Sequence, residues 1–140
     1  MTEPDHDDPM ESLSVSECFA LLRTVDVGRI AVVGSDEVVD IFPVNFVVDH
    51  GTVVFRTAPG TKIAGLTSGH RVAFEADNVG ADGDVWSVVL KGEGALVARR
   101  TDLVDMFDLD VDPWHKSPKP NFVRVTPTET TGRRLRRPGR

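Results

Sequence analysis

The pattern of hydrophobic and polar positions changes period along the chain. Residues 13–24 follow a helical period, and the residues on the expected buried face are Val15, Cys18, Phe19 and Leu22. Ser14 and Glu17 stand three positions apart, the spacing of a capping box at the start of a helix. The pattern therefore predicts one short amphipathic helix, in which Cys18 is a small core residue.

After Gly28 the period shortens to that of strands. Valine-rich runs bounded by turn residues predict six strands, at residues 29–34, 38–48, 52–57, 71–77, 85–98 and 121–127. Two more helices are expected, at residues 61–69 and 101–109. Hairpin-length turns favour a mostly antiparallel sheet, and many short strands with bend signals favour a small barrel. The predicted fold class is mainly β with minor α.

Single residues inside the strands predict where the sheet bends. Pro43 indicates an edge, a bulge or a bend in the second strand, because proline cannot donate a ladder hydrogen bond. Gly92 and Gly94 indicate a bulge or a corner in the fifth strand. Gly51 suits a short hairpin connection after the second strand, because glycine adopts positive φ readily.

Length and charge limit the kind of protein. A chain of 140 residues suits one domain, and we expect a disordered acidic tail at 1–12, the domain at 13–135 and a basic tail at 136–140. A net charge of −6 argues against nucleic acid as a partner. No apolar run is long enough to cross a membrane, and the acidic start is unlike a leader, so a cytoplasmic protein is expected. The five arginines near the end are interpreted as a solvated terminus or a binding arm.

The segment Phe55–Gly65 combines polar residues at a junction between a strand and a helix. Arg56, Thr57, Thr61 and Lys62 supply two cations and two hydroxyls around a glycine, although the chain is acidic. Together with helix amides they would suit a phosphate. The P-loop pattern is absent. The residues alone leave two interpretations open: a phosphate site or ordinary surface charges.

Two further groups of residues are candidates for a ligand site. Asn45 interrupts an apolar strand beside Pro43, which suits either a planar ligand along the strand or a locally satisfied bulge. Trp86 and Trp114 are either packing residues or flanks of an aromatic ligand. No nucleophile, metal or acid–base motif is present, so no catalytic residue and no metal ligand is predicted. Redox chemistry would need a cofactor.

The order of these motifs resembles one family. The segments GRIAVVGSDEVVDIFPVNFVVDHGTVVFRTAPGTKIAGL, VAFEAD and WSVVLKGEGALV are similar to the pyridoxamine 5′-phosphate oxidase-like flavin-binding split-barrel proteins, over roughly residues 16–133. The small actinobacterial-type members are the most similar, not the true oxidase. The resemblance implies a six-stranded antiparallel split barrel, a homodimer, and flavin mononucleotide (FMN) in two grooves between the subunits.

The resemblance also implies roles for individual residues. Arg56, Thr57, Thr61 and Lys62 match the phosphate side of the flavin site. The residues that match the strand along the edge of the flavin ring are Pro43, Val44 and Asn45. Ser87, with Trp86 before it, matches a strand position that reaches the flavin, from the same or the partner subunit. The segment PWHKSPKPNFVRVTP differs from the substrate-binding region of the true oxidase, which argues against pyridoxal phosphate synthesis.

Three hypotheses about function follow. The first is an FMN-binding oxidoreductase with a small-molecule substrate, reduced by a nicotinamide cofactor or another protein. The second is a non-catalytic module that binds flavin or haem for storage or sensing. The third is a reductase that uses a deazaflavin cofactor, whose longer anionic tail would favour a more basic groove.

Overall fold

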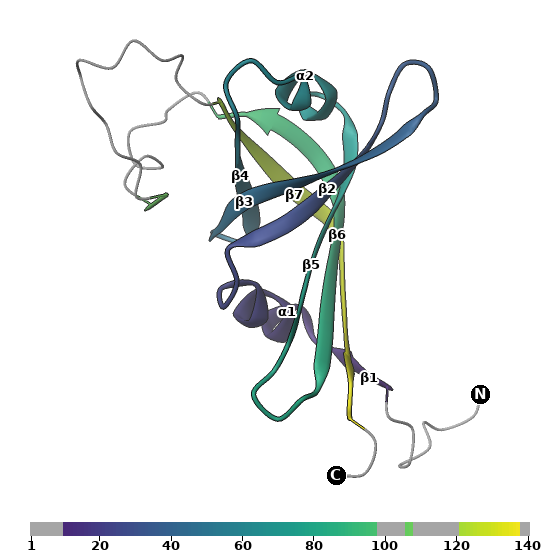
Figure 1. Ribbon diagram of the computed structural model, residues 1–140, viewed down its shortest axis with the longest axis vertical. Coiled ribbons are helices and arrows are strands. Elements are labelled where there is room, and N and C mark those ends of the chain that lie inside the picture. The colour runs from purple at the N-terminus through teal and green to yellow at the C-terminus, as the bar shows by residue number, and fades with distance from the viewer. Residues whose placement is uncertain (1–9, 98–105, 108–120, 138–140) are drawn as a thin grey trace.

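The computed structural model describes residues 10–97, 106–107 and 121–137. These contain seven strands, in chain order β1 (Met10–Leu13), β2 (Val27–Val33), β3 (Val39–Asp49), β4 (Thr52–Thr57), β5 (Arg71–Val79), β6 (Val85–Leu96) and β7 (Asn121–Leu135). They also contain two helices, α1 (Val15–Leu22) and α2 (Ile63–Thr67) (Figure 1). Most of the helix expected at 101–109 and the whole of Trp114 lie outside the described residues.

Six of the strands close into an antiparallel barrel. The order around the wall is β7–β4–β3–β2–β5–β6, and β6 pairs with β7 to complete the ring. Strand β1 adds to the free edge of β7 beyond the end of β4. Helix α1 lies beside the long β5–β6–β7 extension, and α2 lies near the opposite end of the barrel (Figure 1). The predicted six-stranded antiparallel barrel with short flanking helices is confirmed.

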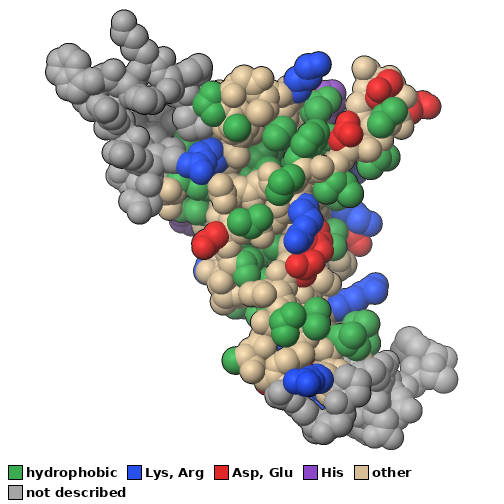
Figure 2. All heavy atoms as spheres, viewed as in Figure 1, with side chains coloured by type: hydrophobic (Ala, Val, Ile, Leu, Met, Phe, Trp, Pro, Cys, Tyr) green, Lys and Arg blue, Asp and Glu red, His purple; other side chains and the backbone are tan. Residues whose placement is uncertain are grey.

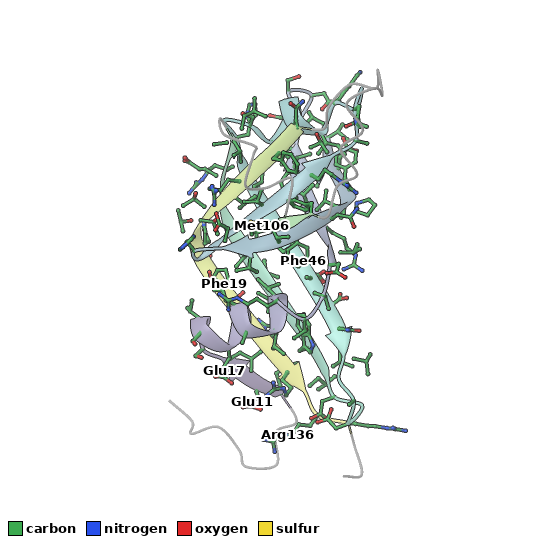
Figure 3. All side chains as sticks on the ribbon, turned by 90° about the vertical axis from the view of Figure 1, so that its left-hand side faces the viewer. Glu11, Glu17, Phe19, Phe46, Met106 and Arg136 are labelled. Carbon is green, nitrogen blue, oxygen red and sulfur yellow. The ribbon has the colours of Figure 1, made fainter. Side chains whose placement is uncertain are left out.

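The alternation of strand residues places one face of each strand inside the barrel. In β4, for example, Val53 and Phe55 are fully buried and point inward. The rings of Phe46 and Phe74 meet edge to face with centroids 4.8 Å apart. Figure 3 shows Phe19 rising from α1 towards the barrel, in whose interior Phe46 lies. Cys18 is fully buried in the same core, as the helical period predicted.

The bends occur where the sequence predicted them. Strand β3 pairs with β2 along residues 39–45 but with β4 only along residues 45–49, so Pro43 lies where one side of the strand has no neighbouring strand among the described elements. The register between β6 and β7 shifts between Lys91 and Gly92. A Cβ at Gly92 would lie 2.0 Å from the carbonyl oxygen of Thr126, so only glycine fits there.

The two ends of the described chain are more ordered than expected. Residues 10–12 were expected to be disordered, but they belong to β1 and pair with β7. Strand β7 continues to Leu135, eight residues beyond the expected end at 127. Two ion pairs hold these ends together, because Glu11 lies 3.9 Å from Arg134 and 3.6 Å from Arg136. Polar strands of this kind carry little apolar periodicity, which is why neither β1 nor the end of β7 was predicted. No helix in the described part of the chain is long and apolar enough to cross a membrane.

Candidate functional site

Arg56 and Asn45 face each other on the outside of the barrel. They are register partners on β4 and β3, so their side chains lie on the same face, with Cβ atoms about 4.5–5.5 Å apart. Asn45 is exposed and Arg56 is half-buried. On the other side of Arg56, β7 places Phe122, which is 1 % exposed and packs in a small outer cluster with Val54. Arg56 therefore stands between the amide residue Asn45 and the apolar residue Phe122 in the sheet.

Lys62 follows Arg56 after a tight turn. Gly60 has a φ of 80°, which lets the chain turn between β4 and α2. Both the amide and the hydroxyl of Thr61 donate to the carbonyl oxygen of Ala58, at 3.3 and 2.8 Å. Lys62 is the exposed residue at the start of α2, whose side chain makes no capping hydrogen bond. The ammonium group is therefore presented at the surface, whereas the donors of Thr61 are used within the turn.

Thr57 lies on the opposite face from Arg56. It is 2 % exposed, and its hydroxyl donates to the carbonyl oxygen of Asn121 at 3.1 Å. Its position therefore differs from the expected one beside the phosphate. The hydroxyl fixes the end of β4 to the start of β7, the two strands that carry Arg56 and Phe122.

Within the described part of the chain, the two cations of this site lack acidic partners. Among the described residues, five lysine and arginine side chains lie within 4.0 Å of a carboxylate: Arg29, Lys91, Arg124, Arg134 and Arg136. No such pair is formed by Arg56 or Lys62 within that part of the chain. Their charge is thus available to an anionic ligand.

Ser87 and Trp86 point to opposite sides of β6. The resemblance predicts Trp86 beside Ser87 at the flavin. In the structure Trp86 is 5 % exposed and belongs to the main core, so its side chain lies away from the polar residues of the outer face. Ser87 is half-buried on the outer face, where its register partners are Asp77 on β5 and Arg133 on β7. Alternation along the strand explains the difference, because neighbouring residues cannot both face one ligand.

One chain does not bring all the expected site residues together. Asn45 lies on β3 and Ser87 on β6, with β2 and β5 between them in the barrel wall. At about 4.8 Å per strand, three steps separate them by about 14 Å around the wall. The outer face thus carries two polar regions: one around Asn45, Arg56 and Lys62, and one around Ser87.

Sequence reasoning missed a charged cluster between these regions. Arg29 on β2 donates from Nη1 to Glu75 Oε1 at 2.7 Å and to Asp77 Oδ1 at 3.4 Å. Burial, then a hydrogen bond with Asp77, raises the pKa of Glu75. A signal existed in the sequence, because Glu75 and Asp77 stand two apart and so share one face of a strand.

The outer face of the β2–β3 hairpin is apolar and exposed. Val27, Val33, Val39 and Ile41 are between 50 % and 65 % exposed. Figure 2 shows hydrophobic side chains gathered over these strands, with acidic and basic side chains among them. Apolar patches of this kind commonly mark contact surfaces.

The comparisons with known proteins agree with this architecture. The family model described as pyridoxamine 5′-phosphate oxidase matches residues 14–134. Since the match covers most of the chain, the protein belongs to this family.

Three relatives are informative. An FAD-binding protein from Mycobacterium smegmatis is 40 % identical, with a TM-score of 0.72 over 90 % of this chain and 98 % of that one. A conserved protein of unknown function from Corynebacterium diphtheriae is 38 % identical, with a TM-score of 0.68 over 92 % of this chain and 100 % of that one. An uncharacterized protein from Mycobacterium tuberculosis is 39 % identical over 87 residues, which are 61 % of this chain and 76 % of that protein.

Proposed function

We propose that this protein binds a flavin nucleotide, whose phosphate is held by Arg56 and Lys62. The observation that carries the proposal is the pairing of Arg56 with Asn45 on one outer face, next to a turn that presents Lys62, with no carboxylate paired to either cation among the described residues. A forked guanidinium and a compact ammonium group together suit a phosphate. The 40 % identical relative that is described as FAD-binding supports a flavin as the ligand.

The strand beside these cations suits the flavin ring. Along Val39–Val44, one side of β3 has no neighbouring strand among the described elements. The backbone groups of Pro43 and Val44 that point away from β2 can therefore meet the polar edge of a planar ligand there, just before Asn45 pairs with Arg56. The exposed amide of Asn45 adds one more donor and acceptor beside the phosphate site.

Thr61 and Thr57 take supporting roles in this proposal. Their hydroxyls donate within the fold, so they fix the turn and the strand end that present the cations. Trp86 holds the core beneath Ser87 and does not touch the ligand.

The proposed site is completed by a second copy of the chain. Ser87 is about 14 Å around the wall from Asn45, so it serves a flavin held by the partner subunit. The exposed apolar face of the β2–β3 hairpin lies between the two polar regions and supplies the dimer contact. A homodimer would bury this face and exclude water from both sites.

We infer that the protein is an oxidoreductase with a small-molecule substrate. A bound flavin supplies two-electron chemistry, with a nicotinamide cofactor or another protein as the reductant. The chain itself contributes binding and orientation: cations for the phosphate, strand backbone for the ring edge, and an apolar contact that shields the site. No side chain is assigned as a proton donor.

FMN is the expected cofactor, and FAD is the alternative that the M. smegmatis relative favours. Both share the ring and the first phosphate, so Arg56 and Lys62 serve either. Purification of the full chain, a visible spectrum and mass spectrometry of the released ligand would identify it.

Titration of the apoprotein with FMN, FAD, riboflavin, a deazaflavin and haem then ranks the candidates. A chain that binds none of the flavins would refute the proposal. Binding of flavin without turnover in the presence of NADH or NADPH and an electron acceptor would favour the non-catalytic module instead.

A further inference from the structure

Arg133 lies on the outer face of β7, not in a terminal tail. Its strand neighbours Gly132 and Arg134 belong to the opposite, inner face. Gly132 is buried against Cys18, and the side chain of Arg134 lies near that of Glu11. Arg133 itself is exposed. The strand therefore presents a guanidinium group to a ligand or another chain bound at this face.

Two hydroxyl side chains flank Arg133. The register places Ser12 of β1 opposite it on one side and Ser87 of β6 opposite it on the other. Directly opposed residues share a face, with Cβ atoms about 4.5–5.5 Å apart. Ser12, Arg133 and Ser87 thus form one line across three strands, here named the Arg133 row.

No acidic side chain neutralises this row among the described residues. Arg134 and Arg136 share Glu11 on the inner side, but no carboxylate of that part of the chain lies within 4.0 Å of Arg133. The nearest acid in the same line is Asp77, one strand beyond Ser87, and it lies 3.4 Å from Arg29. The row therefore offers guanidinium N–H groups and hydroxyls to oxygen acceptors of a ligand.

The shape of the row favours a flat ligand. Ser12, Ser87 and Thr131 are short side chains around the arginine, and all lie on the outer face. A planar ring can approach such a surface and meet the guanidinium edge to edge. A phosphate is the weaker candidate, because Arg56 and Lys62 already provide a site for it.

We propose that the Arg133 row binds the carbonyl edge of the flavin ring held by the partner subunit, and that Arg133 stabilises the reduced flavin. This inference rests on the proposed function, because Ser87 is the residue assigned to the partner's flavin. It adds Arg133 and Ser12 to the site, and it assigns to Arg133 the electrostatic stabilisation of the reduced ring.

This stabilisation follows from the change in the charge of the ring on reduction. When a reductant delivers two electrons and the ring takes up one proton, the ring gains one negative charge. A fixed positive charge at the carbonyl edge stabilises that state more than the neutral, oxidised one. Arg133 therefore makes the bound flavin easier to reduce, whereas the hydroxyls of Ser12 and Ser87 bind both states alike.

Arg133→Gln is the test, and Arg23→Gln is the matched control. Arg23 is an exposed arginine at the end of α1, away from the outer face of the barrel. For each variant, the dissociation constant of oxidised FMN is measured by fluorescence titration. The midpoint potential of the holoprotein is then measured with dithionite and a reference dye, and light scattering checks assembly.

The wild-type protein should bind reduced flavin more tightly, relative to oxidised flavin, than Arg133→Gln does, by a factor of about ten. The midpoint potential of Arg133→Gln should therefore be lower by about 30 mV, the equivalent of that factor for a two-electron couple. Arg133→Lys should retain most of the potential because it keeps the charge, and Arg23→Gln should not change it. An unchanged potential in a folded, flavin-loaded Arg133→Gln protein would overturn the inference and leave the proposed function intact. Loss of FMN affinity without loss of riboflavin affinity would assign Arg133 to a phosphate and also overturn it. A wild-type chain that binds no flavin would refute both.

Discussion

At the scale of single residues, the cations of the outer face differ in what they can do. Arg124 donates to Asp49 at 2.9 Å and to Thr52 at 2.6 Å, and Arg29 is held by Glu75 at 2.7 Å. Such arginines join strands, and the neighbouring carboxylates neutralise much of the positive charge that a ligand would meet. Arg56 and Lys62 have no such partner in the described part of the chain, so a ligand phosphate is their best acceptor.

Substitution of Lys62 should therefore weaken binding of the phosphate selectively. We expect Lys62→Ala to weaken FMN binding by about one to two decades, the equivalent of about 1.5–3 kcal/mol for a charge-assisted hydrogen bond. Riboflavin lacks the phosphate, so its affinity should hardly change. Fluorescence titration of both ligands measures the difference. Equal losses in a folded variant would show that Lys62 acts on something other than the phosphate.

Arg56→Ala should show the same selectivity for FMN over riboflavin. A small loss of stability is also expected, because the stem of Arg56 stands beside the buried Phe122. Arg71→Ala is a suitable control, since Arg71 is an exposed arginine on β5, which is three strands away from β4 around the barrel wall. A similar FMN loss in Arg71→Ala would point to a general effect of net charge.

Asp49 should make stability depend on pH. The hydrogen bond from Arg124, then that from His50, lowers the pKa of Asp49 in the folded protein. A carboxyl with a lowered folded pKa stabilises the fold above its ordinary pKa, and this contribution disappears as the pH falls through the folded value. Asp49→Asn should therefore lower the Tm at pH 7 by about 2–5 °C, with a smaller difference below about pH 4. Thermal melts across this range check it, and a difference that grew on acidification would contradict it.

At the scale of elements, the tail before the barrel divides into two parts. Residues 10–13 form β1, which is joined to β7 by its backbone ladder and by the contacts of Glu11 (Figure 3). Deletion of residues 1–12 should lower the Tm by about 5–10 °C, because several ladder hydrogen bonds are lost. Deletion of residues 1–9 should leave it nearly unchanged, since that stretch lacks apolar periodicity. Equal melting temperatures for the two deletions would mean that β1 does not stabilise the domain.

Local patterns predicted some pairings of the sheet but not others. The two-residue turn at His50 and Gly51, with φ values of 49° and 73°, fixes the register of β3 against β4, so the pairing of Asn45 with Arg56 follows from a nearby signal. Strand β4 has the predicted bounds because Val53 and Phe55 alternate with outward residues. The line of Ser12, Arg133 and Ser87 joins residues far apart in sequence, and its polar side chains have no hydrophobic period. Nothing in the sequence could therefore indicate that Arg133 lies in a strand beside Ser87.

At the scale of the whole molecule, the separation between Asn45 and Ser87 has a direct consequence. Each proposed site takes its phosphate cations from one copy and Ser87 from the other. A variant defective in either part therefore loses both sites of a homodimer. A mixed dimer of two different variants keeps one site with all its residues intact and one site with both defects.

Mixed dimers of Lys62→Glu and Ser87→Trp chains should therefore recover one flavin for every two chains. The first variant repels the phosphate and the second fills the half-buried position of Ser87 with a bulky ring, so each homodimer should hold little FMN. Co-expression with two different affinity tags and purification on both isolates the mixed dimer, and flavin absorbance against protein concentration gives the occupancy. Chains that carry both substitutions are the control, because their dimers contain no intact site. A mixed dimer as empty as the control, or a monomer in light scattering that binds FMN with full affinity, would show that each chain holds its flavin alone.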